Sequence, residues 1–163
     1  MRMTPITPRK NQYALRAVFE LAKHRGKGPT KISDIADAQS IPVRFLEVIL
    51  NGLKGSGLID AKRGFYGGYY LTRSPEKITV ADIMNFMQAP PKREMCAACL
   101  AKTKCPHGNR CAFSAMWNRV NRAILRVYTE TTIQDLLDND RQLQGKKRSA
   151  SKRPLRTRQG RSL

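Results

Sequence analysis

Apolar and polar residues recur with helical spacing in the segment between residues 31 and 57. A short helix is expected over residues 33–38, followed by a break at residues 39–41. Pro42 then suits the first position of a second helix, because the missing N–H of proline would have no partner there. The apolar face of this second helix repeats at i, i+3, i+4 and i+7 and consists of Leu46, Ile49, Leu50 and Leu53. Residues 55–57, Gly-Ser-Gly, favour its end, since glycine adopts the left-handed conformation common at helix C-termini.

Two short β-prone segments, at residues 58–61 and 69–72, follow the second helix. The glycine-rich stretch between them carries Lys62 and Arg63, so it predicts a basic hairpin, or wing. A helix, a turn, a second helix and a basic wing in this order are typical of a winged helix-turn-helix, which places its second helix in the major groove of DNA. A helix pair with a hairpin that plays no part in nucleic-acid binding is the alternative interpretation.

The start of the second helix and the wing contain the candidate DNA-binding residues, which are Pro42, Val43, Arg44, Phe45, Glu47, Arg63 and Gly64. Arg44 and Glu47 are best suited to reading base edges, because a guanidinium pairs with guanine and a carboxylate accepts a hydrogen bond from cytosine. An ion pair of Glu47 with Arg44 or Lys54 is the alternative. Phe45 is expected to pack against the protein or to meet a thymine methyl group, and Arg63 to lie in or beside the minor groove.

A first helix is expected over residues 9–24, which carry an apolar stripe. Helix-start patterns mark two further helices after the wing. Thr79 and Asp82 have the spacing of a capping box, in which the hydroxyl and the acid bind backbone N–H groups reciprocally. Thr132 and Asp135 repeat this pattern. They predict a short last helix that ends near residue 140.

A long helix is expected over residues 112–130. Its apolar residues step by four and three, the spacing of a coiled-coil seam, and are Phe113, Trp117, Val120, Ile124 and Val127. We expect this helix to join two copies of the chain, because a helix-turn-helix commonly binds two half-sites across a two-fold axis. A helix that faces the core of its own chain would show similar spacing.

The charge of the chain indicates that its partner is a polyanion. The 163 residues include 31 Lys and Arg against 12 Asp and Glu, a net charge of +19, which attracts polyanions. Charge alone does not distinguish DNA from RNA or an acidic membrane, but the chain has no long apolar run, and we expect no membrane partner and a cytoplasmic protein. The basic segment 141–163 is predicted to be a disordered tail, since it has little apolar material to bury.

Residues 92–111 show no periodicity and contain all four cysteines, so they predict a cysteine loop. In a reducing cytoplasm these thiols are better read as metal ligands than as disulfides. Cys99, Cys105 and Cys111 have five residues in each interval, and soft thiolates select zinc or an iron–sulfur cluster over hard ions. The spacing does not choose between the two metals, and reduced cysteines without metal are the remaining alternative. A redox-enzyme site formed by Cys96 and Cys99 is disfavoured, because no strand precedes the pair.

Several of these segments resemble the iron–sulfur cluster regulator family of bacterial transcription factors, the IscR/NsrR type. The similarity rests on residues 13–17 (YALRA), 45–47 (FLE), 57–59 (GLI) and 63–71 (RGFYGGYYL), followed by the cysteine loop. It implies that Cys99, Cys105 and Cys111 are ligands of a [2Fe-2S] or [4Fe-4S] cluster, and that the long helix forms the dimer.

The fourth ligand departs from the family pattern. Where one branch of the family has a histidine this chain has Ser114, and where others have an acidic residue in the first helix it has Gln12. Cys96 is the favoured candidate and would complete a set of four thiolates, which also allows a zinc site, while His107 is a further candidate.

Taken together, the sequence predicts a mainly α fold with a small β-wing: a winged helix-turn-helix domain over residues 1–140, which includes the cysteine loop 92–111 and the dimerisation helix 112–130, and a disordered tail over 141–163. The expected function is that of a homodimeric regulator of transcription, not an enzyme. It would bind a pseudo-palindromic double-stranded DNA operator and sense redox state, iron or nitric oxide through an iron–sulfur cluster. The alternatives are a zinc-stabilised or metal-free winged-helix repressor without cluster sensing, and an RNA-binding module led by the basic tail.

Overall fold

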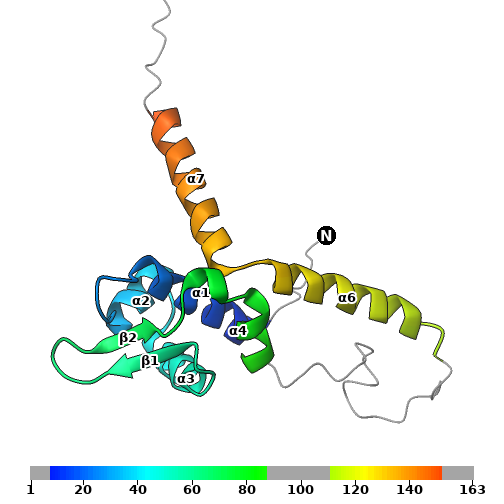
Figure 1. Ribbon diagram of the computed structural model, residues 1–163, viewed down its shortest axis with the longest axis horizontal. Helices are drawn as coiled ribbons and strands as arrows, with labels where there is room; N and C mark the ends of the chain where they lie inside the picture. Colours follow the sequence, from blue (N-terminus) through cyan, green and yellow to red (C-terminus); the bar gives the residue numbers. More distant parts are fainter. Residues whose placement is uncertain (1–7, 88–110, 152–163) are drawn as a thin grey trace, which may run out of the picture.

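The computed structural model describes residues 8–87 and 111–151 (Figure 1). In chain order its elements are α1 (Arg9–Lys23), α2 (Ile32–Gln39), α3 (Val43–Lys54), β1 (Ile59–Lys62), β2 (Gly68–Leu71), the 3-10 turn η1 (Pro75–Lys77), α4 (Val80–Met87), α6 (Ser114–Glu130) and α7 (Ile133–Ser151). The predicted fold, mainly α with a small β-wing, is confirmed, and α3 begins one residue after Pro42 rather than at it.

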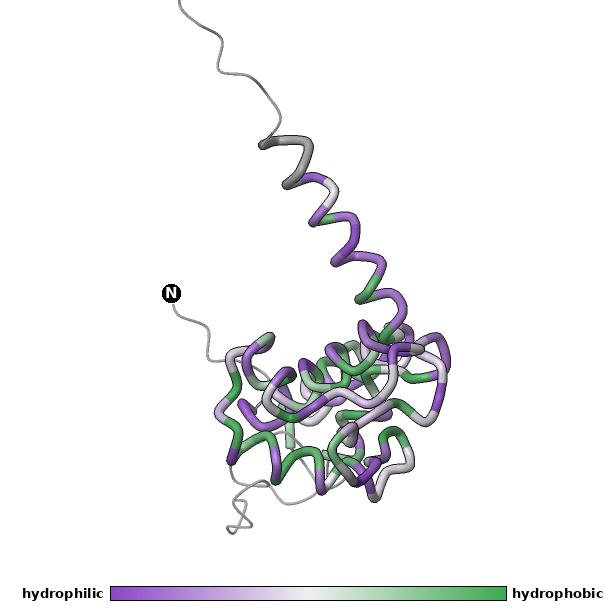
Figure 2. Tube along the Cα trace, turned by 90° about the vertical axis from the view of Figure 1, so that its left-hand side faces the viewer, coloured by the Kyte–Doolittle hydropathy of each residue, from purple (hydrophilic) through white to green (hydrophobic). Residues whose placement is uncertain are grey.

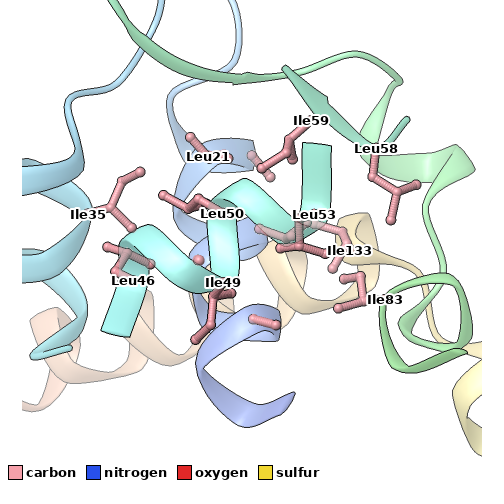
Figure 3. Close-up of a cluster of buried hydrophobic side chains, with 14 of the residues drawn as sticks. Leu21, Ile35, Leu46, Ile49, Leu50, Leu53, Leu58, Ile59, Ile83 and Ile133 are labelled. Carbon is pink, nitrogen blue, oxygen red and sulfur yellow. The ribbon is translucent and has the colours of Figure 1, made fainter. Parts of the chain in front are cut away.

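The hydrophobic core surrounds α3, as Figure 3 shows. All four residues of the predicted apolar face are buried, and Leu46, Leu50 and Leu53 have no exposed surface at all. Ala14 and Ala17 on α1 are also fully buried, and their small side chains allow α1 to approach α3 closely. Burying a leucine side chain contributes about 1.5–3 kcal/mol, so this face alone holds α3 firmly in place.

The wing is a two-stranded antiparallel hairpin in which Ile59 pairs with Leu71 and Lys62 with Gly68. It is anchored to the α1–α2 loop, because Thr30 and Tyr69 exchange two backbone hydrogen bonds of 2.8 Å each. Gly68 lies directly against this bridge, and a Cβ at that position would overlap the backbone of Thr30. The wing is therefore attached to the helical body on both sides, through α3 and through the α1–α2 loop.

Both predicted capping boxes are present. The N–H of Thr79 donates to Asp82 Oδ2 (2.8 Å) and the N–H of Asp82 donates to Thr79 Oγ1 (3.1 Å). Thr132 and Asp135 repeat the exchange at 2.8 and 3.1 Å. The two threonines also form a β-bridge, so the starts of α4 and α7 are tied together and Ile133 is placed in the core.

The predicted end of the last helix near residue 140 is wrong, because α7 continues to Ser151 and includes residues assigned to the disordered tail. Polar side chains one turn apart support this extension: Gln134 and Arg141 donate to Asp138 (3.0 Å each), and Gln144 donates to Asp140 (2.8 Å). Figure 2 shows α7 as a mostly hydrophilic helix that projects from the body. Residues 152–163 lie outside the described residues. Among the helices that are described, none is long and apolar enough to span a membrane.

The α6 helix extends away from the body on the side opposite the wing (Figure 1). It packs against α4, yet within the described part of the chain none of its residues is buried. Three residues of the predicted seam are exposed, Phe113 by 54%, Val120 by 37% and Val127 by 59%. Trp117 and Ile124 of the seam are half-buried, so the described part of one chain covers only part of the seam.

Candidate nucleic-acid interface

The solvent-facing side of α3 is the first part of the candidate interface. Because Leu46, Leu50 and Leu53 face inward, helical geometry turns Arg44 and Glu47 outward, and both are exposed. Val43, the first residue of α3, is 43% exposed. Pro42 is exposed as well, and its carbonyl oxygen accepts the N–H groups of Phe45 and Leu46 (both 3.0 Å), which starts the helix.

Two apolar side chains complete this surface. Phe45 is 57% exposed, while its ring meets that of Tyr13 of α1 edge to face at a centroid distance of 6.4 Å. It thus packs against the protein and still presents a face to solvent. Val48 is 64% exposed and lies one turn after Arg44, on the same side of α3. Val48 was not among the residues predicted from the sequence, although its i+4 spacing from Arg44 was a usable signal.

The charges on α3 are not neutralised by each other. Among the residues that the structure describes, no ion pair joins Glu47 to Arg44 or to Lys54. The alternative role of Glu47 as a pairing partner is therefore not seen. Both the guanidinium and the carboxylate remain available to a ligand in front of the helix.

The wing lies beside α3 and contributes Arg63 and Gly64, both exposed (Figure 1). Gly64 has a φ of 108°, which favours glycine, and its carbonyl oxygen accepts the N–H of Gly67 (2.9 Å) to close the turn. The residues between these glycines, Phe65 and Tyr66, are 81% and 84% exposed, and the sequence analysis assigned them no role.

A buried carboxylate supports the helix-turn-helix from behind. Glu20 of α1 is 2% exposed, and it accepts hydrogen bonds from Gln39 Nε2 at the end of α2 (2.7 Å) and from Lys23 Nζ (3.2 Å). His24 Nε2 lies 3.2 Å from the other carboxylate oxygen. Burial raises the pKa of Glu20, but the bonds from Gln39, Lys23 and His24 outweigh it and leave the pKa below its ordinary value. Glu20 thereby fixes the end of α2, from which Ser40, with a φ of 50°, turns the chain into α3.

Only one of the predicted metal ligands, Cys111, lies within the described residues. It is a free, half-buried thiol just before α6, and its carbonyl oxygen accepts the N–H (3.1 Å) and the hydroxyl (2.8 Å) of Ser114. The hydroxyl of Ser114 is thus used in starting α6. Within residues 8–87 and 111–151 no group of three or more His, Cys, Asp or Glu side chains is placed to bind a metal. The predicted ligands Cys96, Cys99 and Cys105 and the candidate His107 lie outside the described residues.

The chain as a whole is similar to known regulators of transcription. The chain is 30% identical over an alignment of 164 residues to the HTH-type transcriptional regulator IscR of Xenorhabdus nematophila, with 96% of both chains covered. It is 32% identical over 127 residues to the HTH-type transcriptional regulator CymR of Bacillus subtilis, covering 78% of this chain and 86% of that protein.

Solved structures of proteins with the same two names are also similar to this chain. The structure of T. potens IscR matches with a TM-score of 0.69 at 28% identity, covering 85% of this chain and 90% of that one. The structure of CymR (YrzC), the global cysteine regulator of B. subtilis, matches with a TM-score of 0.68 at 31% identity, covering 84% and 98%. The family model of Rrf2, described as an iron-dependent transcriptional regulator, matches residues 7–139. The chain therefore belongs to the Rrf2 family, whose members are DNA-binding regulators of transcription and not enzymes.

Proposed function

We propose that this chain is a cytoplasmic regulator that binds a pseudo-palindromic double-stranded DNA operator as a homodimer. The observation that carries the proposal is the outward face of α3, where Arg44, Glu47 and Val48 are exposed at helical spacing beside the basic wing. These side chains suit guanine, cytosine and the thymine methyl group in turn, so one helix face can read several base pairs in the major groove. Pro42, Val43 and Phe45 lie at the edge of the same surface, and Arg63 and Gly64 extend it toward the neighbouring minor groove.

The homodimer is supported by α6. Phe113 at its N-cap and the α6 residues Val120 and Val127 remain exposed within one chain, and an exposed apolar stripe of this length is typical of an interface. A second copy packed on the same stripe would bury it symmetrically, because a two-fold interface uses the same patch twice. Two copies also place two α3 helices for two half-sites.

Replacing Arg44 with alanine tests the assignment of α3. The DNA is a duplex recovered by in vitro selection with the wild-type protein from a randomised library. Arg44→Ala should cost about 1–3 kcal/mol on this duplex and relax the preference at one base pair. Arg141→Ala is the matched control, since Arg141 is an exposed arginine on α7, which projects away from α3. Equal weakening on all sequences would make Arg44 a phosphate contact instead.

We further propose that the thiolates of Cys99, Cys105 and Cys111 hold an iron–sulfur cluster, either [2Fe-2S] or [4Fe-4S], with Cys96 as fourth ligand. The donor chemistry fits, because the thiol of Cys111 is unpaired and half-buried, and soft thiolates are the ligands that such clusters use. When bound, the cluster would supply a centre that changes with redox state, iron supply or nitric oxide. Relatives named IscR, and a family described as iron-dependent, support this assignment.

The position of Cys111 can affect α3 through packed elements. Cys111 immediately precedes α6, and α6 packs on α4. Phe86 of α4 in turn lies against the end of α3, where a Cβ added at Gly55 would be 3.5 Å from its ring. A shift of the cysteine loop would therefore move α6 and α4, and with them the pose of α3, which is how a change at one site alters binding at another.

Anaerobic purification followed by iron, sulfide and zinc analysis tests the cluster. A brown protein with stoichiometric iron and sulfide is expected, and replacing Cys99, Cys105 or Cys111 with serine should remove both and change operator affinity. A colourless protein with stoichiometric zinc would refute the cluster and make the metal structural.

The second candidate function is DNA-binding regulation without a cluster. It is favoured by the similarity to CymR, which is described as a cysteine regulator. It predicts that the three serine variants leave both metal content and operator affinity unchanged, while Arg44→Ala still weakens binding.

A further inference from the structure

The tip of the wing presents two large aromatic side chains to solvent. Phe65 is 81% exposed and Tyr66 is 84% exposed, the highest values among the large exposed apolar side chains that the structure describes. The two rings contact each other edge to face at a centroid distance of 5.1 Å and an interplanar angle of 86°. Such exposed apolar groups are costly to hydrate, and when they lie together they mark a contact surface. The exposure of both rings on the loop of the wing therefore indicates that this loop contacts a partner.

Glycines hold this tip in a defined shape. At Gly67 a Cβ would overlap the carbonyl oxygen of Lys62 and approach the carbonyl of Gly64 to 2.7 Å, so the turn closes only with glycine there. Next to it, Gly68 lies against Thr30, whose bridge to Tyr69 attaches the hairpin to the α1–α2 loop. The aromatic pair is therefore carried outward on an anchored turn, and Figure 1 shows this β1–β2 loop protruding beyond the helices.

Cations surround the aromatic pair. Lys31, which directly follows the Thr30 bridge, places its ammonium group 5.3 Å from the centre of the Phe65 ring. Lys62 and Arg63 precede the pair and are exposed. The nearest carboxylate in the hairpin sequence, Asp60, is engaged by the N–H of Ala61 (2.7 Å) and the hydroxyl of Tyr70 (3.4 Å). An apolar pair with a rim of cations is complementary to a groove with apolar sugar walls between two rows of phosphates.

We propose that Phe65 and Tyr66 form an apolar wedge that contacts the sugars and base edges of the DNA minor groove beside Arg63. This rests on the proposed function and adds two specificity-determining residues to it. The wing would then recognise the operator through shape and deformability as well as charge, because inserted apolar side chains favour steps that unstack easily. Pyrimidine–purine steps are expected under the wing in the selected duplex.

Alanine variants separate this contact from a purely ionic one. Phe65→Ala/Tyr66→Ala should weaken binding to the selected duplex by about tenfold or more, since contacts between aromatic rings and nucleotides are worth that much or more. The slope of log affinity against log salt should stay at the wild-type value, because no phosphate contact is lost. By contrast, Arg63→Ala should reduce the slope by about 1 if it meets a phosphate. Hydroxyl-radical protection of the minor groove under the wing should weaken in the aromatic variant.

Two controls complete the experiment. Leu143→Ala removes an apolar side chain of α7 that is 60% exposed, and it should bind like the wild type. Far-UV circular dichroism and thermal unfolding should be unchanged in the double variant, because neither side chain is part of the core.

The remaining results overturn the proposal. If the double variant binds within about twofold of the wild type while Arg44→Ala loses affinity, the wing tip is not on the DNA and the role of α3 stands. A salt slope that falls as far as in Arg63→Ala would show that the aromatic pair only positions cations. If the wild type selects no duplex at all, the proposed function fails and this inference fails with it.

Discussion

Glu20 offers the sharpest test of how the helix-turn-helix is held, because one buried carboxylate joins the ends of α1 and α2. Glu20→Gln keeps the size of the side chain, and its amide oxygen can still accept the hydrogen bond from Gln39, now 2.7 Å long. It removes the negative charge that faces Lys23 and His24. Hydrogen bonds to a charged group contribute about 1.5–3 kcal/mol each. The side chains of Lys23 and His24 are 37% and 40% exposed, so water replaces part of what they lose. We therefore expect a loss of about 1–2 kcal/mol in the free energy of unfolding at pH 7.

The pH dependence has a definite sign. Burial raises the pKa of Glu20, and the hydrogen bonds from Gln39, Lys23 and His24 lower it by more, so the folded protein holds this pKa below the ordinary value of 4.5. A carboxylate with a depressed pKa stabilises the fold above its unfolded pKa and loses that contribution as the pH falls through the folded pKa. The difference in stability between the wild type and Glu20→Gln should therefore be largest near neutrality and should shrink in acid below pH 4.5.

Urea unfolding at matched protein concentration measures both effects. Glu130→Gln is the matched control, since Glu130 pairs with Arg126 at 3.2 Å on the surface, where the two side chains are 64% and 77% exposed. An exposed pair of this kind is worth less than about 1 kcal/mol. If Glu20→Gln costs no more than Glu130→Gln at pH 7, or if its cost persists unchanged in acid, the assigned role of the buried charge is wrong.

Four further substitutions test the fold. Removing either capping hydroxyl, by Thr79→Ala or Thr132→Ala, should lower stability by about 0.5–2 kcal/mol in denaturant unfolding, and an unchanged midpoint would contradict the capping boxes. Leu50→Ala empties a fully buried site and should cost about 2–5 kcal/mol; a smaller loss would mean that the core collapses around the cavity. Gly68→Ala should force the wing away from Thr30 and lower DNA affinity at unchanged helix content by circular dichroism, whereas binding like the wild type would show that this anchor is dispensable.

Local signals allowed most of the fold to be predicted. Apolar residues at helical spacing located α3, and the Thr-x-x-Asp patterns located the starts of α4 and α7 to within a residue. The end of α7 was missed because it has no apolar periodicity. Its middle turns carry pairs of polar side chains such as Gln144 with Asp140, which a search for a buried face does not detect.

The candidate site was predictable where one helix face determines it. The inward leucines of α3 imply that Arg44 and Glu47 point outward, and they do. Contacts between distant segments were not predictable in this way: Glu20 and Gln39 are separated by 19 residues, and no periodic pattern brings them together. The exposure of Phe65 and Tyr66 is similarly a property of the folded turn, since an aromatic side chain in a loop can equally fold back onto the core.

The position of α6 connects the proposed sensing by the cysteine loop with the proposed binding of the operator. Because none of its residues is buried within the described part of one chain, its pose depends on α4 and on whatever covers its apolar stripe. A second copy packed on that stripe would act on the side of α6. A ligand held by Cys111, three residues before Ser114, would act on the start of the same helix. The end of α3 contacts Phe86 of α4, so the same pose also reaches the proposed DNA-reading surface. Dimer formation, the cysteine loop and operator binding are thus expected to be energetically coupled, and α6 is the element that carries the coupling.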